Sequence, residues 1–189
     1  MPSPTLRKDA ARNWQHIVDT GRRFVDDGVP LRLNDVARAA SIGVATVYRH
    51  FPVPEALLET IARPALAELA SAADRALTLS ADDPWQAFAG FLGTGIDTQV
   101  ADPSVQPVIA AGDHALPETT DLVTRLHTTT GLLLERAQTA GAVRAGLTHE
   151  DVVRLMCGVV FAASVHAHPG ERSALTRTYL EIVLSGLRA

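Results

Sequence analysis

The 189-residue sequence contains one cysteine and few aromatic residues, and each shortage excludes a class of protein. A single cysteine cannot form an internal disulfide framework, a thiolate zinc site or a CxxC redox pair. Aromatic residues make up only 5% of the chain, whereas alanine and leucine are frequent, and this balance favours helices over strands. No stretch reaches the ~18 consecutive apolar residues that indicate a membrane-spanning helix.

The N-terminal segment MPSPTLRKDAARNW lacks the apolar core and the cleavage site of a secretory signal. We therefore expect a cytoplasmic protein that does not associate with membranes. The chain is 47% hydrophobic with a net charge of −4, which argues against disorder and suits one or two compact domains.

Charge is distributed unevenly along the chain. Residues 1–50 contain eight Lys and Arg against five Asp, whereas residues 51–189 contain nine Arg against sixteen Asp and Glu. A basic module on an acidic body is the distribution that a phosphate-binding head would need. A difference of this size also arises by chance, so it supports nucleic-acid binding only together with a motif.

Apolar residues recur at three- and four-residue steps along the whole chain, which predicts an all-α fold of about nine helices. Pro, Gly and Asp residues mark the boundaries between helices, and no strand-like alternation or internal repeat is present. One long helix is expected to begin at Pro54. Pro64 lies inside it and removes the hydrogen bond to the Thr60 carbonyl, which predicts either a kink or a simple break. The expected helices cover residues 14–25, 33–40, 45–50, 54–77, 84–101, 104–111, 118–140, 149–167 and 171–187.

Residues 33–50 contain two short expected helices separated by a turn of about four residues. This spacing lets the helices cross steeply, as in a helix-turn-helix, although an ordinary helical hairpin has the same spacing. Val47 should point into the core with Phe51. The second helix carries side chains that can donate hydrogen bonds to phosphate oxygens or base edges, namely Thr46, Tyr48, Arg49 and His50.

Three stretches occur in order within residues 7–61: IVDTGRRFVDDG, LNDVARAASIGVATVYRHFP and EALL. In order and spacing they resemble the N-terminal domain of the TetR family of one-component bacterial transcription regulators. The most specific part is Thr-x-Tyr-x-His-Phe-Pro, which begins at Thr46 and is followed by Glu-Ala-Leu. The resemblance implies that Tyr48 and His50 contact DNA phosphates, and that the groove is faced by Gly43, Val44, Thr46 and Arg49.

The sequence departs from the family pattern at three positions. Arg32 stands where Thr or Ser usually caps the second helix, so the cap is weaker but a cation that can reach phosphate is gained. Ser41 stands in place of the turn glycine and must either adopt a left-handed conformation or avoid it. Pro54 replaces a usual basic residue, which removes one expected phosphate contact.

The resemblance implies a division into two parts. Residues 1–53 would form a three-helix helix-turn-helix head for DNA binding, and residues 54–189 a larger helical body for ligand binding and dimerisation. The expected function is that of a ligand-responsive regulator: a repressor that binds a near-palindromic double-stranded DNA operator as a homodimer and is released by a small-molecule effector. The alternative is a helical ligand-binding or enzymatic domain whose head no longer binds DNA.

An effector pocket in the body would combine apolar walls with a few polar groups. An aromatic stripe at helical spacing is also typical of a plain core, so both interpretations stay open for each residue. The body contains no Lys and only scattered Arg, so we expect a mainly apolar effector whose polar group meets Gln99, His127 or Thr130. The candidate pocket residues are Trp85, Phe88, Leu92, Gln99, His127, Thr130, Leu134, Met156 and Phe161.

The last two expected helices are apolar on more sides than one buried face requires. Their excess apolar surface must meet either other helices of the same body or a second chain. The resemblance implies a four-helix bundle across a two-fold axis. The candidate interface residues are Val159, Ala162, Ala163, Tyr179, Leu180, Val183 and Leu184.

No catalytic, metal or cofactor site is expected, and the protein should not be an enzyme. The imidazoles of His166 and His168 would point about 200° apart on a helix, so they would not share a metal. Cys157 lies among apolar residues and is expected to be an inert core thiol. The glycines Gly90, Gly93 and Gly95 follow no strand, so they do not indicate a nucleotide-binding loop.

Overall fold

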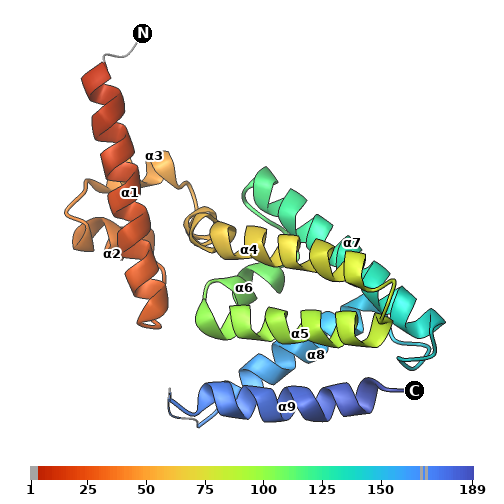
Figure 1. The fold of residues 1–189 in the computed structure, drawn as a ribbon. Helices are drawn as coiled ribbons and strands as arrows, with labels where there is room; N and C mark the ends of the chain where they lie inside the picture. The colour runs from red at the N-terminus through yellow and green to blue at the C-terminus, as the bar shows by residue number, and fades with distance from the viewer. Residues whose placement is uncertain (1–3, 167, 169) are drawn as a thin grey trace.

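The computed structural model describes residues 4–166, 168 and 170–189, and all regular elements in this part of the chain are helices (Figure 1). The prediction of an all-α fold with about nine helices is confirmed for these residues. The helices are α1 (Pro4–Asp26), α2 (Leu33–Ala39), α3 (Val44–His50), α4 (Pro54–Leu79), α5 (Pro84–Ala101), α6 (Val105–Ile109), α7 (Pro117–Thr139), α8 (His149–Ser164) and α9 (Arg172–Leu187).

Helices α1, α2 and α3 form a head at one end of the molecule, apart from the body that contains α5 to α9 (Figure 1). Ile17, Val36 and Val47 are fully buried at the centre of the head, and Phe51 packs with them. The expectation that Val47 and Phe51 point into the core is confirmed. Because Val47 faces inward, the rest of α3 is free to face outward.

Helix α4 belongs to both parts of the molecule. Its first turns bury Leu57 and Ile61 in the core of the head, whereas Leu66 and Leu69 are buried in the core of the body. A Cβ atom on Gly21 would lie 2.9 Å from Ile61 Cδ1, so a larger residue there would have to displace the Ile61 side chain where α1 packs against α4. The helix continues through Pro64 without interruption. One continuous helix therefore connects the core of the head with the core of the body.

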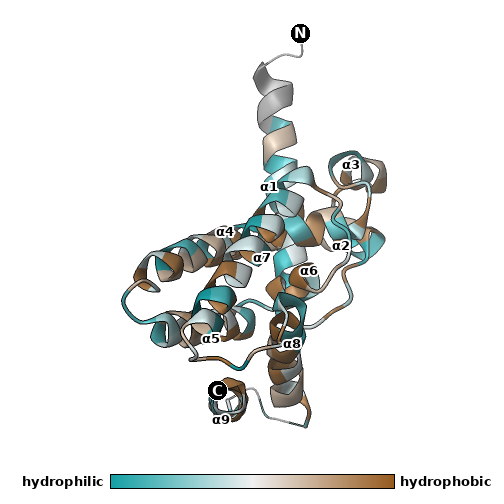
Figure 2. Cartoon of the chain, turned by 90° about the vertical axis from the view of Figure 1, so that its right-hand side faces the viewer, coloured by the Kyte–Doolittle hydropathy of each residue, from teal (hydrophilic) through white to brown (hydrophobic). Residues whose placement is uncertain are grey.

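The body has a single large core, in which Phe88, Ile96 and Leu133 are fully buried. Helices α4, α5 and α7 surround this core, and α8 and α9 pack together, with α9 at the bottom of the body in both views (Figures 1 and 2). None of the helices in the described residues has the length and hydrophobicity that spanning a membrane requires.

Helix α8 ends earlier than the sequence predicts. The expected end at residue 167 lies outside the described residues, and the last helical residue is Ser164. The chain leaves the helix because Val165 is extended and His166 has a left-handed backbone, with φ of 55°. Since His166 is not helical, the helical argument about its orientation relative to His168 does not apply.

Candidate functional site

The turn between α2 and α3 fixes how the outer helix of the head is presented. Ser41 has φ of 53°, and its neighbour Ile42 donates a backbone hydrogen bond to the Ala37 carbonyl at 3.0 Å. A bond of this kind is typical of a helix that is followed by a residue with a left-handed backbone, and that residue is usually glycine. Ser41 thus adopts the left-handed conformation itself. Arg32 makes no side-chain cap, in agreement with the weak cap expected at the start of α2.

The outward surface of α3 carries the side chains with hydrogen-bonding capacity. Tyr48 is 44% exposed, Arg49 is exposed, and Thr46 and His50 are half-buried beside them. Figure 2 shows α3 at the outer edge of the head, away from α5 and α9. All seven residues predicted for DNA binding therefore lie on α3, at its start or at the start of α2, and none is buried: Arg32, Gly43, Val44, Thr46, Tyr48, Arg49 and His50.

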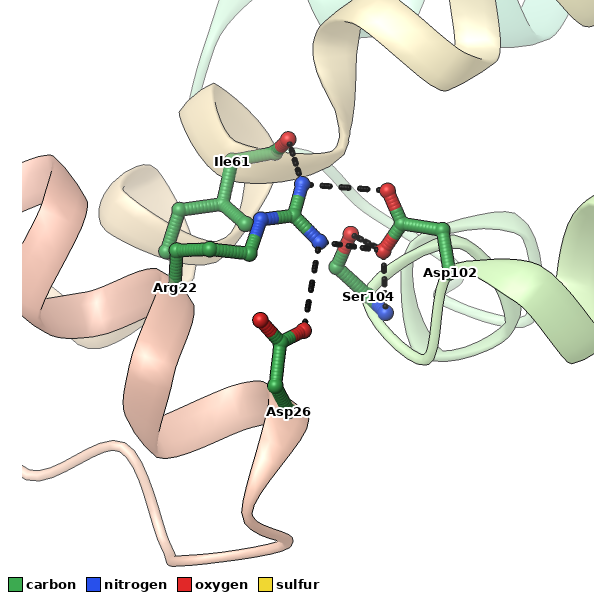
Figure 3. Close-up of polar contacts among 5 residues, drawn as sticks. All are labelled: Arg22, Asp26, Ile61, Asp102 and Ser104. Carbon is green, nitrogen blue, oxygen red and sulfur yellow. Dashed lines mark hydrogen bonds and ion pairs between the residues drawn. The ribbon is translucent and has the colours of Figure 1, made fainter.

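A polar cluster joins the head to the body (Figure 3). The Arg22 guanidinium on α1 donates to both carboxylate oxygens of Asp102, at 2.6 and 3.0 Å, and to the Ile61 carbonyl at 2.7 Å. Asp102, directly after α5, also accepts hydrogen bonds from the backbone and hydroxyl of Ser104. Arg22 thus contacts both α4 and the end of α5.

The surroundings of this cluster favour the ionised forms of both Arg22 and Asp102. Burial alone would raise the pKa of Asp102, but hydrogen bonds from Arg22 and Ser104 outweigh burial and hold it below its ordinary value. The hydrogen bond to Asp102 likewise raises the pKa of Arg22. The pair is therefore ionised at neutral pH.

A second polar link joins the loop before α7 to α4. The buried carboxylate of Glu59 on α4 accepts hydrogen bonds from the backbone N–H groups of Ala115 and Leu116, at 2.7 and 2.9 Å. Leu116 also packs against the core of the head. The loop before α7 is therefore fastened to the head half of α4.

A cavity of about 50 Å³, partly open to solvent, lies in the body between α4, α5, α6, α7 and α8, and its walls are largely apolar. Five of the nine residues predicted for the pocket line it, and these are Leu92, Gln99, His127, Thr130 and Met156. The remaining lining residues are Leu69, Phe91, Gly95, Ile109, Leu126, Val152, Val153 and Cys157.

Three polar atoms on or near the wall of this cavity have no hydrogen-bond partner among the described residues. They are Gln99 Oε1, His127 Nε2 and the Nε2 atom of His149, whose ring lies 4.6 Å from that of His127 between centroids. Burial lowers the pKa of His127, and the neighbouring imidazoles of His149 and His114 lower it further. His127 is therefore neutral at pH 7.

Comparison with known proteins identifies the family to which this fold and site belong. Residues 83–189, more than half of the chain, match the TetR family model described as "Transcriptional regulator SbtR-like, C-terminal domain". The chain belongs to the TetR family of transcriptional regulators. It is a ligand-responsive regulator rather than an enzyme.

Solved TetR regulators share the fold over nearly the whole chain. A regulator from Streptomyces coelicolor is 27% identical, with a TM-score of 0.54, and the match covers 93% of this chain and 98% of that one. One from Mycobacterium vanbaalenii is 25% identical, with a TM-score of 0.50 and coverage of 97% and 99%. PfmR from Thermus thermophilus is 21% identical, with a TM-score of 0.61 and coverage of 93% and 96%. No curated protein matches the chain in sequence.

Four residues predicted for the pocket of this TetR-family chain lie outside the cavity. Phe88 and Leu134 are buried in the core, and the ring of Trp85 lies 4.4 Å below the Arg188 guanidinium. Phe161 is 68% exposed and borders a separate cavity that also includes Gln99. A helix rises about 1.5 Å per residue, so Trp85 and Gln99 are roughly 21 Å apart along α5 and cannot line one small cavity.

Several residues that line the cavity of this TetR-family body are not among those that the sequence predicts. Leu69 comes from α4 and Ile109 from α6, two helices outside the predicted pocket. Cys157, expected as a core thiol, lines the cavity, where burial raises the pKa of its thiol and keeps it protonated. The apolar periodicity marked these residues as buried, but it contained no signal that separates a cavity wall from close-packed core.

A groove between α8 and α9 marks an apolar surface of the TetR-family body. Leu155, Val159, Ala162, Tyr179 and Val183 line it, together with Ile182, which is 64% exposed. Four of the predicted interface residues therefore border the groove.

Two of the other predicted interface residues are already buried within their own chain. Leu180 is 8% exposed and packs near Gly93 on α5, and Ala163 is also buried. Leu184 is half-buried against the same core. Leu180 faces α5, so it is not available to a second chain, whereas Ile182, two residues further on, points outward.

Proposed function

We propose that this chain is a repressor that binds a near-palindromic operator as a homodimer and is released when a small, mainly apolar effector enters the body. The observation that carries the proposal is the exposed hydrogen-bonding surface of α3, joined by α4 and by the Arg22–Asp102 pair to a body that contains a largely apolar cavity.

In this proposal α3 enters the major groove. Thr46 and Arg49 approach base edges, while Tyr48 and His50 contact phosphates and position the helix. Arg32, exposed at the start of α2, supplies a further cation toward the backbone. The basic charge of residues 1–50 supports this arrangement.

A homodimer would bring two such heads to one operator. The apolar groove between α8 and α9, with Leu155 and Ile182 exposed along it, supports pairing of this face with a second copy. Two-fold pairing would relate the two α3 helices by the symmetry that a palindromic site requires.

The size of the cavity suggests how an effector acts. Ligand pockets usually have volumes of roughly 300 Å³ or more, so an effector has to separate the helices that line the cavity. Two of the helices that line the cavity also contact the head. Helix α4 contributes Leu69 to the cavity wall and continues into the head, and the end of α5 carries Asp102, which pairs with Arg22. Effector binding would therefore tilt the head and change the spacing of the two α3 helices.

A gel-shift assay with the DNA flanking the protein's own gene tests the proposal. We expect a specific complex whose stability falls with increasing salt. Tyr48→Phe and His50→Ala should weaken binding on all sequences alike, whereas Thr46→Ala or Arg49→Ala should change base preference by about 1–3 kcal/mol. Arg75→Ala, which removes an exposed cation on the body half of α4, is the matched control.

Two outcomes would count against the proposal. Absence of any specific complex at low salt would favour the alternative, a ligand-binding body whose head no longer binds DNA. An operator motif that stays unchanged in both Thr46→Ala and Arg49→Ala would remove these residues from the reading surface.

A further inference from the structure

Gln99 lines the cavity, and the oxygen of its buried side-chain amide has no hydrogen-bond partner among the described residues. Gln99 is 7% exposed, and its Nε2 donates to the Gly95 carbonyl one turn earlier at 3.1 Å. This bond fixes the amide orientation, because the flipped amide would set two oxygens against each other. Gln99 Oε1 then points elsewhere and has no partner. A buried carbonyl oxygen without a donor is unfavourable, so it marks a place for a donor.

We infer that the effector is a small neutral molecule with an apolar body and one hydroxyl or N–H group, and that this group donates a hydrogen bond to Gln99 Oε1. This inference rests on the proposed function, because it names the chemical class of the molecule that the cavity receives.

The lining of the cavity argues for a neutral ligand. It contains no Asp, Glu, Lys or Arg side chain among the described residues, so a charged ligand would be buried without a counter-charge. His127 is the only lining residue that could become cationic at moderately acidic pH, and its lowered pKa keeps it neutral at pH 7. An anionic effector would therefore find no cation in the wall.

The other polar groups restrict where the ligand's donor can bind. The Thr130 hydroxyl already donates to the Leu126 carbonyl at 2.7 Å, so its one hydrogen is used. Neutral His127 can either accept or donate at Nε2, so it does not select the ligand by itself. Gln99 Oε1 can only accept, and it therefore selects a ligand with a donor.

Gln99 also borders a second cavity of about 150 Å³ between the ends of α5, α8 and α9. Phe161 and Arg172, which line this second cavity, are exposed to solvent. Gln99 therefore forms part of the wall of both cavities.

Phenol and toluene test the inference on the full-length protein, because they are similar in size and differ in the hydroxyl donor. Titration followed by NMR or by thermal shift should give phenol at least ~10-fold tighter binding than toluene, and benzoate should bind more weakly than phenol. In Gln99→Leu this preference should disappear, with weaker phenol binding and equal or tighter toluene binding. Gln86→Leu, the same change at an exposed position of α5, should keep the wild-type preference.

Gln99→Met, which is unbranched and close to glutamine in volume, is measured beside Gln99→Leu, and circular dichroism checks that both are folded. An unchanged ratio of phenol to toluene affinity in the folded variants overturns the inference. Tighter binding of benzoate, or no binding of phenol to the wild-type protein, also overturns it.

The gel-shift assay separates this inference from the proposed function. Specific DNA binding without selectivity for phenol leaves the regulator intact and refutes the inference. Selectivity for phenol that depends on Gln99, in a protein that binds no DNA, supports the inference about the cavity and refutes the proposed repressor.

Discussion

Arg22 and Asp102 are 80 positions apart in the sequence and form a two-pronged ion pair between the head and the end of α5 (Figure 3). The same helix α5 carries Gln99 three residues earlier, on the wall of the cavity. In the proposed function, a change in the position of α5 would therefore reach the head through this side-chain contact as well as through α4.

Asp102→Asn should lower the free energy of unfolding by about 1–3 kcal/mol at pH 7, because a charge-assisted hydrogen bond is lost from a partly buried site. Urea unfolding measures the effect. Asp26→Asn is the matched control, because Asp26 lies 3.7 Å from the same guanidinium but is exposed, so its loss should cost less than about 0.5 kcal/mol.

The same pair should make stability depend on pH. The folded pKa of Asp102 lies below its ordinary value of 3.8, so its contribution is present above pH 3.8 and is lost as the pH falls through the folded pKa. The difference between wild type and Asp102→Asn should therefore shrink in acid. A difference that stays constant down to pH 3 would contradict the ionic origin of the contact.

Ser41→Gly should stabilise the protein by about 0.5–1 kcal/mol, because Ser41 holds a left-handed backbone with φ of 53° that glycine adopts without steric cost. Thermal unfolding measures the change. Gly28→Ala, at φ of 66° and with open space around the position, should shift stability in the opposite direction. If both substitutions changed the free energy of unfolding in the same direction, backbone strain at Ser41 would be ruled out.

Ile182→Glu should convert the proposed homodimer into a folded monomer with much weaker operator binding, because a charge would be buried at the apolar groove. Light scattering and circular dichroism measure assembly and folding. Leu180→Glu should instead unfold the body, because Leu180 is buried within its own chain. A wild-type protein that is monomeric at micromolar concentration would refute the dimer.

His127 should make the protein less stable at mildly acidic pH. Its folded pKa lies below the ordinary value of 6.5, so the unfolded chain takes up the proton first. Stability should be full above pH 6.5 and should fall as the pH decreases through the folded pKa. His127→Gln should flatten this slope in urea unfolding between pH 7 and 5, and His16→Gln on the exposed side of α1 is the control.

The sequence by itself determined most helix boundaries, because those signals are local; the exceptions are the start of α1, at Pro4 rather than near residue 14, and the end of α8, at Ser164. The Asp83 side chain accepts a hydrogen bond from Gln86 N at the start of α5, and Thr148 and Asp151 form a capping box at the start of α8. Gly141, with φ of 67°, follows the end of α7, where a left-handed residue is usually glycine. The inward position of Val47 also followed from local spacing, and it left the candidate DNA-binding residues of α3 outside.

Only the tertiary structure decided which buried residues line a cavity and which exposed ones could meet a partner. Helical periodicity assigns Phe88 and Leu92 to the same apolar class, yet Phe88 is core and Leu92 is cavity wall. Likewise, Leu180 is covered by its own chain, whereas Ile182 is not. The physical reason is that a helix repeats every 3.6 residues and so defines its faces, but the residues that cover each face come from distant segments, as Asp102 does for Arg22.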